Sequence, residues 1–272
     1  MAVIAGTTSC DDFLDREPMS SISPETYYST AAQLEANLND EYPNVLPSFG
    51  QWTYGIFGED KGTDNQIEVN ANDRYTQDRW KVPHSESDNW KFERIYRINF
   101  FLSEALPKFG EDMSGSQNTI SGSVATIKHY IGEMYFLRAY EYFKKLQLFG
   151  DFPIINQPLA DEMEALREAS KRFPRNEVAR FIISDLDKAY AYMSDVDMAT
   201  TRINKDVAML VKSRVALFEA TWLQNFKGTA FVPGGEGWPG ASLHNNYQYP
   251  SGNIDNEVKY FLEQAVEASK LV

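Results

Sequence analysis

The longest helical pattern in the chain is the feature that most limits its fold. In residues 123–149, apolar side chains recur at steps of three and four, as on one face of a helix. A helix that is apolar around most of its circumference has to be buried by its neighbours. We therefore expect this helix at the centre of a helical domain, capped by Gly150, with only three residues at its solvent-facing edge: Glu141, Lys144 and Lys145.

Five further segments have helical patterns with recognisable ends. Ser23, Pro24 and Glu25 predict a start near residue 24, and Pro43 predicts its end. Asn176 and Asn204 are suited to cap two later helices. The expected ranges are 24–41, 88–108, 177–194, 205–226, and one from about 255 that still runs at Val272. Because there is little β signal, we predict an all-α fold of antiparallel hairpins of tetratricopeptide-like size.

Two arginines lie on apolar helix faces, Arg138 and Arg214. An unpaired buried charge costs several kcal/mol, so we expect each to be buried beside a carboxylate. Asp185 and Glu133 are the candidates for these partners.

Two long segments rich in aromatic residues have no regular pattern, 48–87 and 227–253. Loops of this length inside a compact domain usually carry function. Sugars present apolar C–H faces ringed by hydroxyl groups, which suit a flat aromatic ring beside amides, carboxylates or arginines. The stretches 72–90 and 238–249 offer this mixture. The candidate ligand-binding residues are Tyr75, Arg79, Trp80, His84 and Asn89 in the first stretch, and Trp238, Asn245, Tyr247 and Tyr249 in the second.

The same aromatic residues have a structural alternative, in which they only pin the loops onto the helices. For any one of them this is at least as good an explanation as ligand binding. Trp90 and Tyr96 stand at helical spacing with Phe92, and we expect both in the core.

Charge and composition exclude several classes of function. A formal net charge of -13 repels phosphate backbones, and no basic cluster offsets it, so we expect no nucleic-acid partner. The three histidines show no metal-ligand spacing, and we expect neither a metal nor a cofactor. Residues 235–240 match GxGxxG, but prolines at 233 and 239 and the surrounding loop argue against a nucleotide site. No apolar run approaches the roughly 20 residues that span a bilayer.

The single cysteine, Cys10, follows a short apolar start and the small residues Thr7, Thr8 and Ser9. Bacterial lipoproteins are cut directly before a cysteine in this setting, and that cysteine carries the lipid. The alternative is a small thiol buried in the fold. We expect residues 1–22 to comprise a remnant signal peptide, the lipid-anchor cysteine and a tether, followed by a helical domain over 23–272.

Four stretches, taken in order, resemble the SusD/RagB family of outer-membrane lipoproteins from Bacteroidetes. They are CDDFLDREP from Cys10, GEMYFLRAYEYFKKLQLFGDFPII at 132–155, RNEVARFIISDLDKAYAYM at 175–193 and TRINKDVAMLVKSRVALFEATW at 201–222. The second stretch is the most specific of the four. Family members are about twice as long, so the resemblance implies that this chain is the N-terminal half of such a domain.

The resemblance also implies a function. It implies a lipid-anchored protein on the cell surface that captures oligosaccharide or polysaccharide and delivers it to a SusC-type TonB-dependent transporter in the outer membrane. Members of the family are not enzymes. They take part in polysaccharide utilisation, and some bind peptides or other nutrients.

Two other functions remain open from the sequence. A helical glycoside hydrolase needs two carboxylates on opposite sides of the scissile bond, and the loop pairs available for this are Glu59 with Asp60 and Asp73 with Asp78. A peptide-binding or protein-binding helical repeat is equally compatible with the expected fold.

Overall fold

The computed structural model describes residues 27–47, 66, 89–110, 112–194, 198 and 201–272, and in these ranges it is helical without any strand. Isolated β-bridges join Thr30 to Ser121 and Phe152 to Phe173. The all-α prediction is therefore confirmed. The elements are α2 (Ala31–Val45), α3 (Glu93–Phe109), α4 (Val124–Phe149), α5 (Met163–Ala169), α6 (Arg175–Tyr192), α7 (Lys205–Asn225), the 3-10 helix η3 (Pro239–Ser242) and α8 (Ile254–Ser269).

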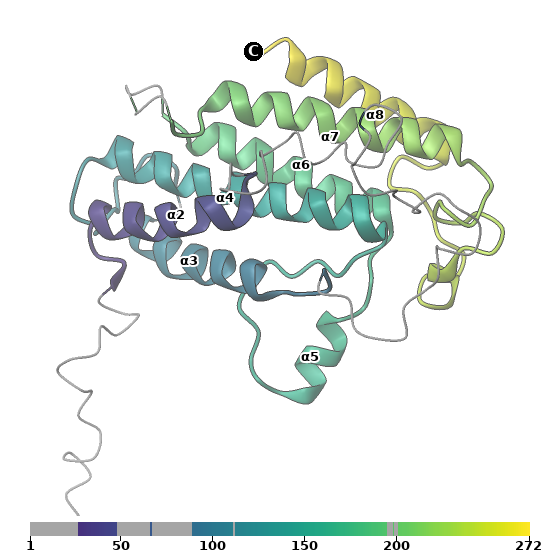
Figure 1. Ribbon diagram of the computed structural model, residues 1–272, viewed down its shortest axis with the longest axis horizontal. Coiled ribbons are helices and arrows are strands. Elements are labelled where there is room, and N and C mark those ends of the chain that lie inside the picture. Colours follow the sequence, from purple (N-terminus) through teal and green to yellow (C-terminus); the bar gives the residue numbers. More distant parts are fainter. Residues whose placement is uncertain (1–26, 48–65, 67–88, 111, 195–197, 199–200) are drawn as a thin grey trace, which may run out of the picture.

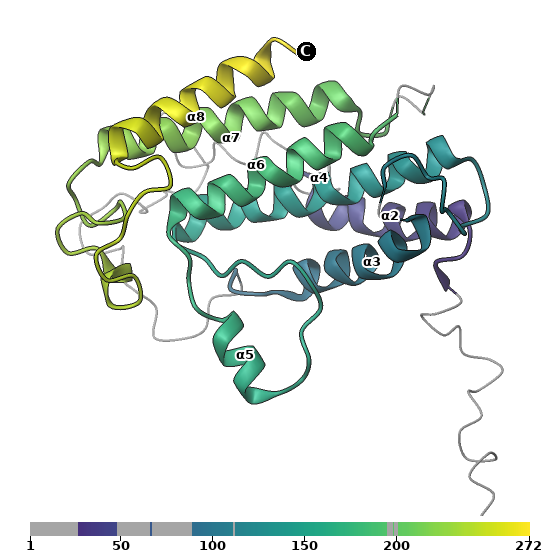
Figure 2. The ribbon, with the colours of Figure 1, turned by 180° about the vertical axis from the view of Figure 1, so that it is seen from behind.

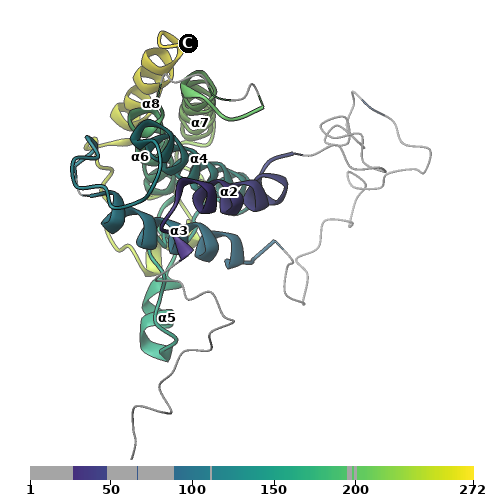
Figure 3. The same ribbon diagram turned by 90° about the vertical axis from the view of Figure 1, so that its left-hand side faces the viewer.

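The long helices lie side by side, and consecutive ones run in opposite directions (Figure 1). Helix α4 packs against α2, α3 and α6, while α6 packs on α7 and α7 on α8. Seen nearly along the bundle, α2 and α3 lie on one side of α4 and α6, and α7 and α8 on the other (Figure 3). None of the described helices is long and apolar enough to cross a membrane.

Helix α4 is enclosed along most of its length, as its sequence pattern predicts. The Ser123 side chain accepts from the Thr126 amide at its start, and Gly150 ends it with a φ of 68°. The expected wet edge is wrong, because Glu141 and Lys145 are buried and Lys144 is half-buried.

Neighbouring segments cover this edge of α4. Lys144 Nζ donates to the Val45 carbonyl at the end of α2 (2.9 Å), and Lys145 Nζ donates to the Asn89 carbonyl before α3 (2.7 Å). Glu141 lies 2.6 Å from Lys144 Nζ and 3.4 Å from Lys145 Nζ, so its charge is balanced.

Helix boundaries agree with the predictions where a side chain caps the backbone directly. Asn204 accepts from the Val207 amide and starts α7 as expected. In contrast, α6 begins at Arg175 behind Pro174, because the Asn176 side chain bonds to Tyr247 and Glu257 instead of capping. Helix α8 ends at Ser269, earlier than predicted.

Helix α2 differs from its prediction at both ends. It begins with a capping box formed by Thr30 and Gln33, and the predicted start at Ser23 and Pro24 lies outside the described residues. Pro43 lies inside the helix instead of ending it. Because proline has no amide N–H, one helical hydrogen bond is lost there, and the helix ends two residues later at Val45.

Helix α3 buries one face against α4. Ile95, Ile98 and Asn99 are buried, whereas Tyr96 is 51% exposed and its assignment to the core is wrong. Trp90 is half-buried and packs as expected, with ring centroids 5.6 Å from Phe92 and 4.9 Å from Phe149.

Helix α5 was not predicted, and it lies on the connection from α4 to α6, which projects from the bundle below α3 (Figure 2). It has seven residues, and none is buried. Phe152 and Phe173 exchange two backbone hydrogen bonds of 3.1 and 3.2 Å, which close the base of this excursion.

Arg138 is buried, and its partner is Asp185, one of the two suggested carboxylates. The guanidinium makes two bonds to Asp185 (2.6 and 2.8 Å), one to the Asn99 side chain and one to the Asn156 carbonyl. The expectation for Arg214 is wrong, because α7 turns it to solvent. The corresponding buried arginine is Arg175.

A second buried network surrounds Glu133 of α4. It accepts from Arg202 (2.6 and 2.8 Å) and from the Tyr42 hydroxyl of α2 (2.9 Å), and its Oε1 lies 3.0 Å from His129 Nε2. His129 Nδ1 accepts from the Ser194 amide at 3.3 Å. These bonds tie α2 and the segment before α7 onto α4.

Gly132 allows α4 to approach the end of α6, and replacing it tests this packing. A Cβ at this position would lie 2.8 Å from the Met193 nitrogen and 2.9 Å from the Ala189 carbonyl oxygen, both backbone atoms. For Gly132→Ala, overpacking costs about 2 kcal/mol while the gain in helix propensity returns about 1 kcal/mol. We expect a net loss of about 1 kcal/mol in the free energy of unfolding by urea denaturation.

Gln147→Ala on the exposed side of the same helix is the control, with a change within roughly 0.5 kcal/mol expected. A Gly132→Ala protein as stable as the wild type would mean that the two helices separate freely.

Candidate ligand-binding loop

The segment 227–253 connects α7 to α8 at the end of the bundle where α4 finishes (Figure 1). It folds on itself through short-range backbone bonds, including Thr229 to Phe226 (3.0 Å), Gly235 to Val232 (3.1 Å) and Glu236 to Gly228 (3.1 Å). A Cβ on Gly235 would lie 1.9 Å from the Thr229 carbonyl oxygen, so only glycine fits there.

The GxGxxG match falls within these turns. Residues 235–240 lead through Trp238 into the short helix η3, and not from a strand into a long helix. The amide groups therefore lack the strand-turn-helix arrangement that holds a pyrophosphate.

Trp238 is only 5% exposed. Its Nε1 donates to Asp151 Oδ2 (2.7 Å), and Asp151 Oδ1 accepts from the Arg175 amide (2.8 Å). Burial raises the pKa of Asp151, although the bonds from Trp238 and Arg175 act against this shift. The expectation that Trp238 offers its ring to a ligand is corrected: the ring anchors the loop to the α4–α6 connection.

Tyr247 and Tyr249 join the same cluster. The ring centroids of Trp238 and Tyr247 are 5.6 Å apart, and those of Tyr247 and Tyr249 are 5.2 Å apart. The Tyr247 hydroxyl bonds to the Asn176 side chain, and the Tyr249 hydroxyl donates to the Pro233 carbonyl (2.7 Å). Burial raises the pKa of both hydroxyls. All three aromatic residues therefore hold the loop in shape.

Glu257 of α8 fastens the other end of the loop. It accepts from Arg180 (2.7 and 2.9 Å), from the Asn176 side chain (3.0 Å) and from the Ser251 amide (3.1 Å). Burial alone would raise the pKa of Glu257, but these hydrogen bonds outweigh it and hold the pKa below its ordinary value.

A third buried pair lies below the loop. Arg175 bonds to Glu219 of α7 with its Nη2 at 2.9 Å, and its guanidinium lies 4.1 Å from the centre of the Trp222 ring. Burial raises the pKa of Glu219 and the charge of Arg175 opposes this. This ion pair therefore lies beneath the loop, in the interior.

The aromatic side chain that the loop does expose is Phe231, which is 61% exposed. Its backbone is held on both sides, because its amide donates to Thr229 Oγ1 (3.3 Å) and its carbonyl accepts from Trp222 Nε1 (3.0 Å). We call Phe218, Trp222, Phe226 and Phe231 the aromatic ladder. Its successive ring centroids lie 5.9, 4.6 and 5.4 Å apart.

Only part of this ladder is predictable from the sequence, and it was not predicted above. Phe218, Trp222 and Phe226 recur every four residues and therefore share one helix face. Phe231 lies beyond the end of the helix, where periodicity says nothing about its direction.

The remaining predicted residues do not join this cluster. Asn245 is exposed and has no hydrogen-bond partner in the part of the chain that the structure describes. Asn89 is exposed, and its carbonyl binds Lys145. Outside the described residues lie Cys10, Tyr75, Arg79, Trp80 and His84, and also the carboxylates Glu59, Asp60, Asp73 and Asp78.

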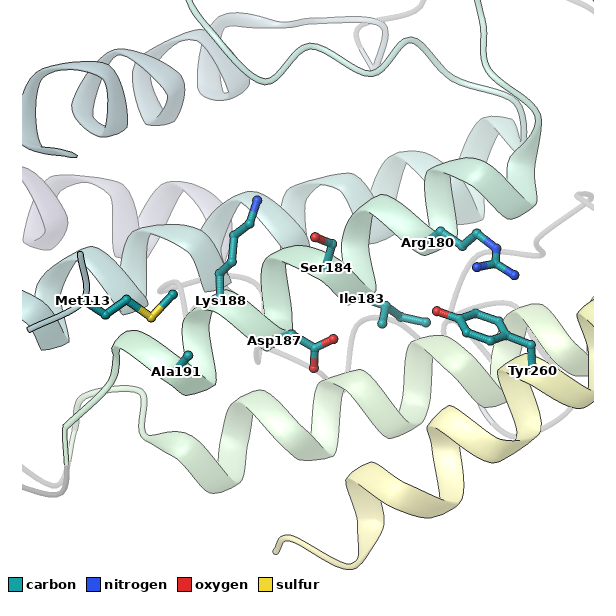
Figure 4. A pocket seen from close by; sticks show the side chains of 8 residues that line it. All are labelled: Met113, Arg180, Ile183, Ser184, Asp187, Lys188, Ala191 and Tyr260. Carbon is teal, nitrogen blue, oxygen red and sulfur yellow. The ribbon is translucent and has the colours of Figure 1, made fainter. Parts of the chain in front are cut away.

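Figure 4 shows a groove of about 340 Å³ along α6, where Arg180 faces Tyr260 of α8. Its charged groups are already paired, Arg180 with Glu257 and Asp187 with Lys212 (2.6 Å). This leaves little to recognise a ligand. Across the described ranges, no cluster of histidine, cysteine or acidic side chains has the arrangement of a metal site.

Comparison with known proteins gives a family match. A family model of SusD-like proteins, described as starch-binding and associating with the outer membrane, matches residues 12–217. Two SusD-like proteins of Formosa agariphila are 26% and 25% identical to this chain, over 82% and 79% of its length. The chain covers only 43% and 41% of those relatives.

Solved structures resemble the chain more distantly. A SusD-like carbohydrate binding protein from Bacteroides vulgatus is 16% identical with a TM-score of 0.48, over 85% of this chain and 50% of that one. A laminarin binding SusD-like protein is 20% identical with a TM-score of 0.39, over 50% of this chain and 27% of that one.

The Glu257 clamp generates a pH-dependent prediction. The pKa of Glu257 in the folded protein is below its unfolded value of about 4.3. The charged carboxylate therefore stabilises the folded state fully above pH 4.3, and this stabilisation is lost as the pH falls through the folded pKa. We expect Glu257→Gln to lower the free energy of unfolding by about 2 kcal/mol at pH 7. Urea denaturation should show the difference from wild type narrowing toward pH 3.

The control is Glu263→Gln, an exposed carboxylate on the same helix, which should stay close to wild type at every pH. If the free energies of unfolding of Glu257→Gln and wild type differ by the same amount at pH 7 and pH 3, then ionisation of Glu257 does not contribute to the pH dependence of stability.

Proposed function

The chain belongs to the SusD-like family, and on that premise we propose that it binds oligosaccharides at the outer surface of the cell and passes them to a SusC-type TonB-dependent outer-membrane transporter. The family match, over residues 12–217, is the observation that carries this proposal. The chain spans less than half of the length of these two relatives. The activity of the whole protein is therefore proposed here, together with the role of this chain.

The loop 227–253 supports glycan binding on physical grounds. Its turns, its buried anchor Trp238 and the Glu257 clamp hold the loop in one conformation. An exposed aromatic ring on such a loop loses little conformational entropy when a ligand binds. Phe231 therefore suits stacking against the apolar face of a sugar ring, and the same loop also exposes polar groups such as Asn245.

The first aromatic loop is the second part of the proposed site. Tyr75, Arg79, Trp80, His84 and Asn89 combine ring faces with hydrogen-bonding groups, and their role stays a prediction from the sequence. Trp80 is the strongest candidate among them because indole offers the largest ring face.

We propose that the protein binds glycans and does not cleave them. The family is described by starch binding and membrane association. The described carboxylates below the loop, Asp151, Glu219 and Glu257, are all engaged by donors, and none forms an open pair of the kind a glycosidase needs.

We propose that residues 1–22 tether the domain to the outer membrane through a lipid on Cys10. The support is the local sequence, in which small residues precede the only cysteine of the chain. Such an anchor requires no membrane-spanning helix.

Glycan binding is tested by affinity electrophoresis against laminarin, starch and other polysaccharides. We expect the protein to be retarded by at least one of them without releasing sugar, and Phe231→Ala to weaken that retention by about tenfold through the lost stacking contact. Leu217→Ala, at an apolar α7 residue that is 50% exposed, is the matched control and should behave as wild type.

Released sugar would instead support the hydrolase. Retention by a peptide panel without any binding of polysaccharide would favour the peptide-binding repeat. Equal retention of Phe231→Ala and wild type would remove Phe231 from the site, and Trp80→Ala then tests the first loop in the same assay.

The anchor is tested by expressing the protein in a Bacteroidetes host with a labelled fatty acid. Wild type should incorporate the label and sediment with membranes, whereas Cys10→Ala should do neither, because the thiol that carries the lipid is absent. Ser9→Ala keeps a small residue before the cysteine and should remain labelled. Labelled Cys10→Ala protein would refute this attachment site.

A further inference from the structure

A groove of about 330 Å³ lies between the second half of α4 and the start of α3 with the residues just before it. We propose that this groove binds the acidic group of a charged sugar, a carboxylate or a sulfate ester. The proposal rests on the proposed glycan-binding function and names a substrate class for it. We call it the basic groove, lined among others by Lys91, Arg94, Lys144, Lys145, Glu93 and Glu141.

The charge of the basic groove is opposite to that of the protein. Four cationic side chains and two carboxylates line it, while the whole chain carries a net charge of -13. A local excess of positive charge attracts an anion over short distances, where it outweighs the screened charge of the remaining surface.

Two of these cations are held in place and keep donors for a ligand. Arg94 donates to the Asn44 carbonyl, its single acceptor among the described residues, although a guanidinium has five N–H groups. Lys144 Nζ donates to the Val45 carbonyl (2.9 Å) and lies 2.6 Å from Glu141 Oε2 in an ion pair, while an ammonium group has three N–H donors.

A structural role explains part of this arrangement. The carbonyls of Asn44 and Val45 end helix α2, and cationic side chains commonly satisfy such groups. This role accounts for one bond from each cation. It does not account for the remaining donors or for the hollow between α3 and α4, and both suit a bound anion.

The other lining groups favour a sugar over a simple inorganic anion. Glu93 is exposed and can accept from hydroxyl groups, and Leu148, also exposed, offers an apolar surface to a C–H face. The basic groove is also at the same end of the bundle as the aromatic ladder, because Phe143 of α4 packs on Phe218 with ring centroids 5.6 Å apart.

Isothermal titration of the chain with oligogalacturonate, a sulfated carrageenan oligosaccharide and a neutral malto-oligosaccharide of the same length tests the proposal. We expect an acidic oligosaccharide to bind more tightly than the neutral one. Arg94→Gln should weaken the acidic ligand by about tenfold, the loss of one charge-assisted hydrogen bond, and leave neutral binding unchanged.

Lys259→Gln removes the same charge from an exposed position on α8 and should change nothing. Because Arg94 is exposed, its variant should retain the wild-type thermal unfolding midpoint. Lys144→Gln is a second variant at a half-buried position, and the same unfolding measurement shows whether it is folded.

Three results would overturn the proposal: tighter binding of the neutral ligand, unchanged acidic binding in both groove variants, or full displacement of the acidic sugar by inorganic sulfate at the same concentration. Binding of the malto-oligosaccharide but of neither acidic oligosaccharide would overturn this inference and leave the proposed glycan-binding function intact. Failure of every saccharide to bind would overturn both.

Discussion

The cost of burying polar groups on α4 governs the arrangement of the whole bundle. This helix carries Arg138, Glu133 and His129 in the interior, and each neighbouring element supplies a partner for one of them. A helix shifted by one turn would leave a buried charge unpaired, at a cost of several kcal/mol. Apolar burial drives the helices together, while these pairs select one register among many that would bury similar area.

The same principle places the loop 227–253. Trp238 of the loop donates to Asp151, which also accepts from the Arg175 amide at the start of α6. The Ser251 amide donates to Glu257 of α8, which also pairs with Arg180 of α6. The loop is therefore continuous with the scaffold, and not a flexible addition to it. Rigid presentation of Phe231 follows from buried pairs several residues away.

Prediction from the sequence succeeded where one local rule decides the outcome. The α4 pattern, the Ser123 and Asn204 caps and the burial of Arg138 beside Asp185 all follow from periodicity or from a single hydrogen bond. It failed where tertiary partners compete. Asn176 forgoes a cap to bind Glu257, and Arg214 faces solvent although apolar residues surround it in sequence. For Trp238 and Phe231, composition identified an aromatic loop but could not tell which ring turns inward, since that depends on Asp151 from another segment.

The excursion that carries α5 has a consequence for how such a domain can change over time. Phe152 and Phe173 seal its neck with paired backbone hydrogen bonds, and no residue of α5 enters the core. Residues between 157 and 171 can therefore be lengthened, shortened or exchanged while α4 and α6 keep their places. The bundle thus offers one position where new surface can evolve without a repacked interior.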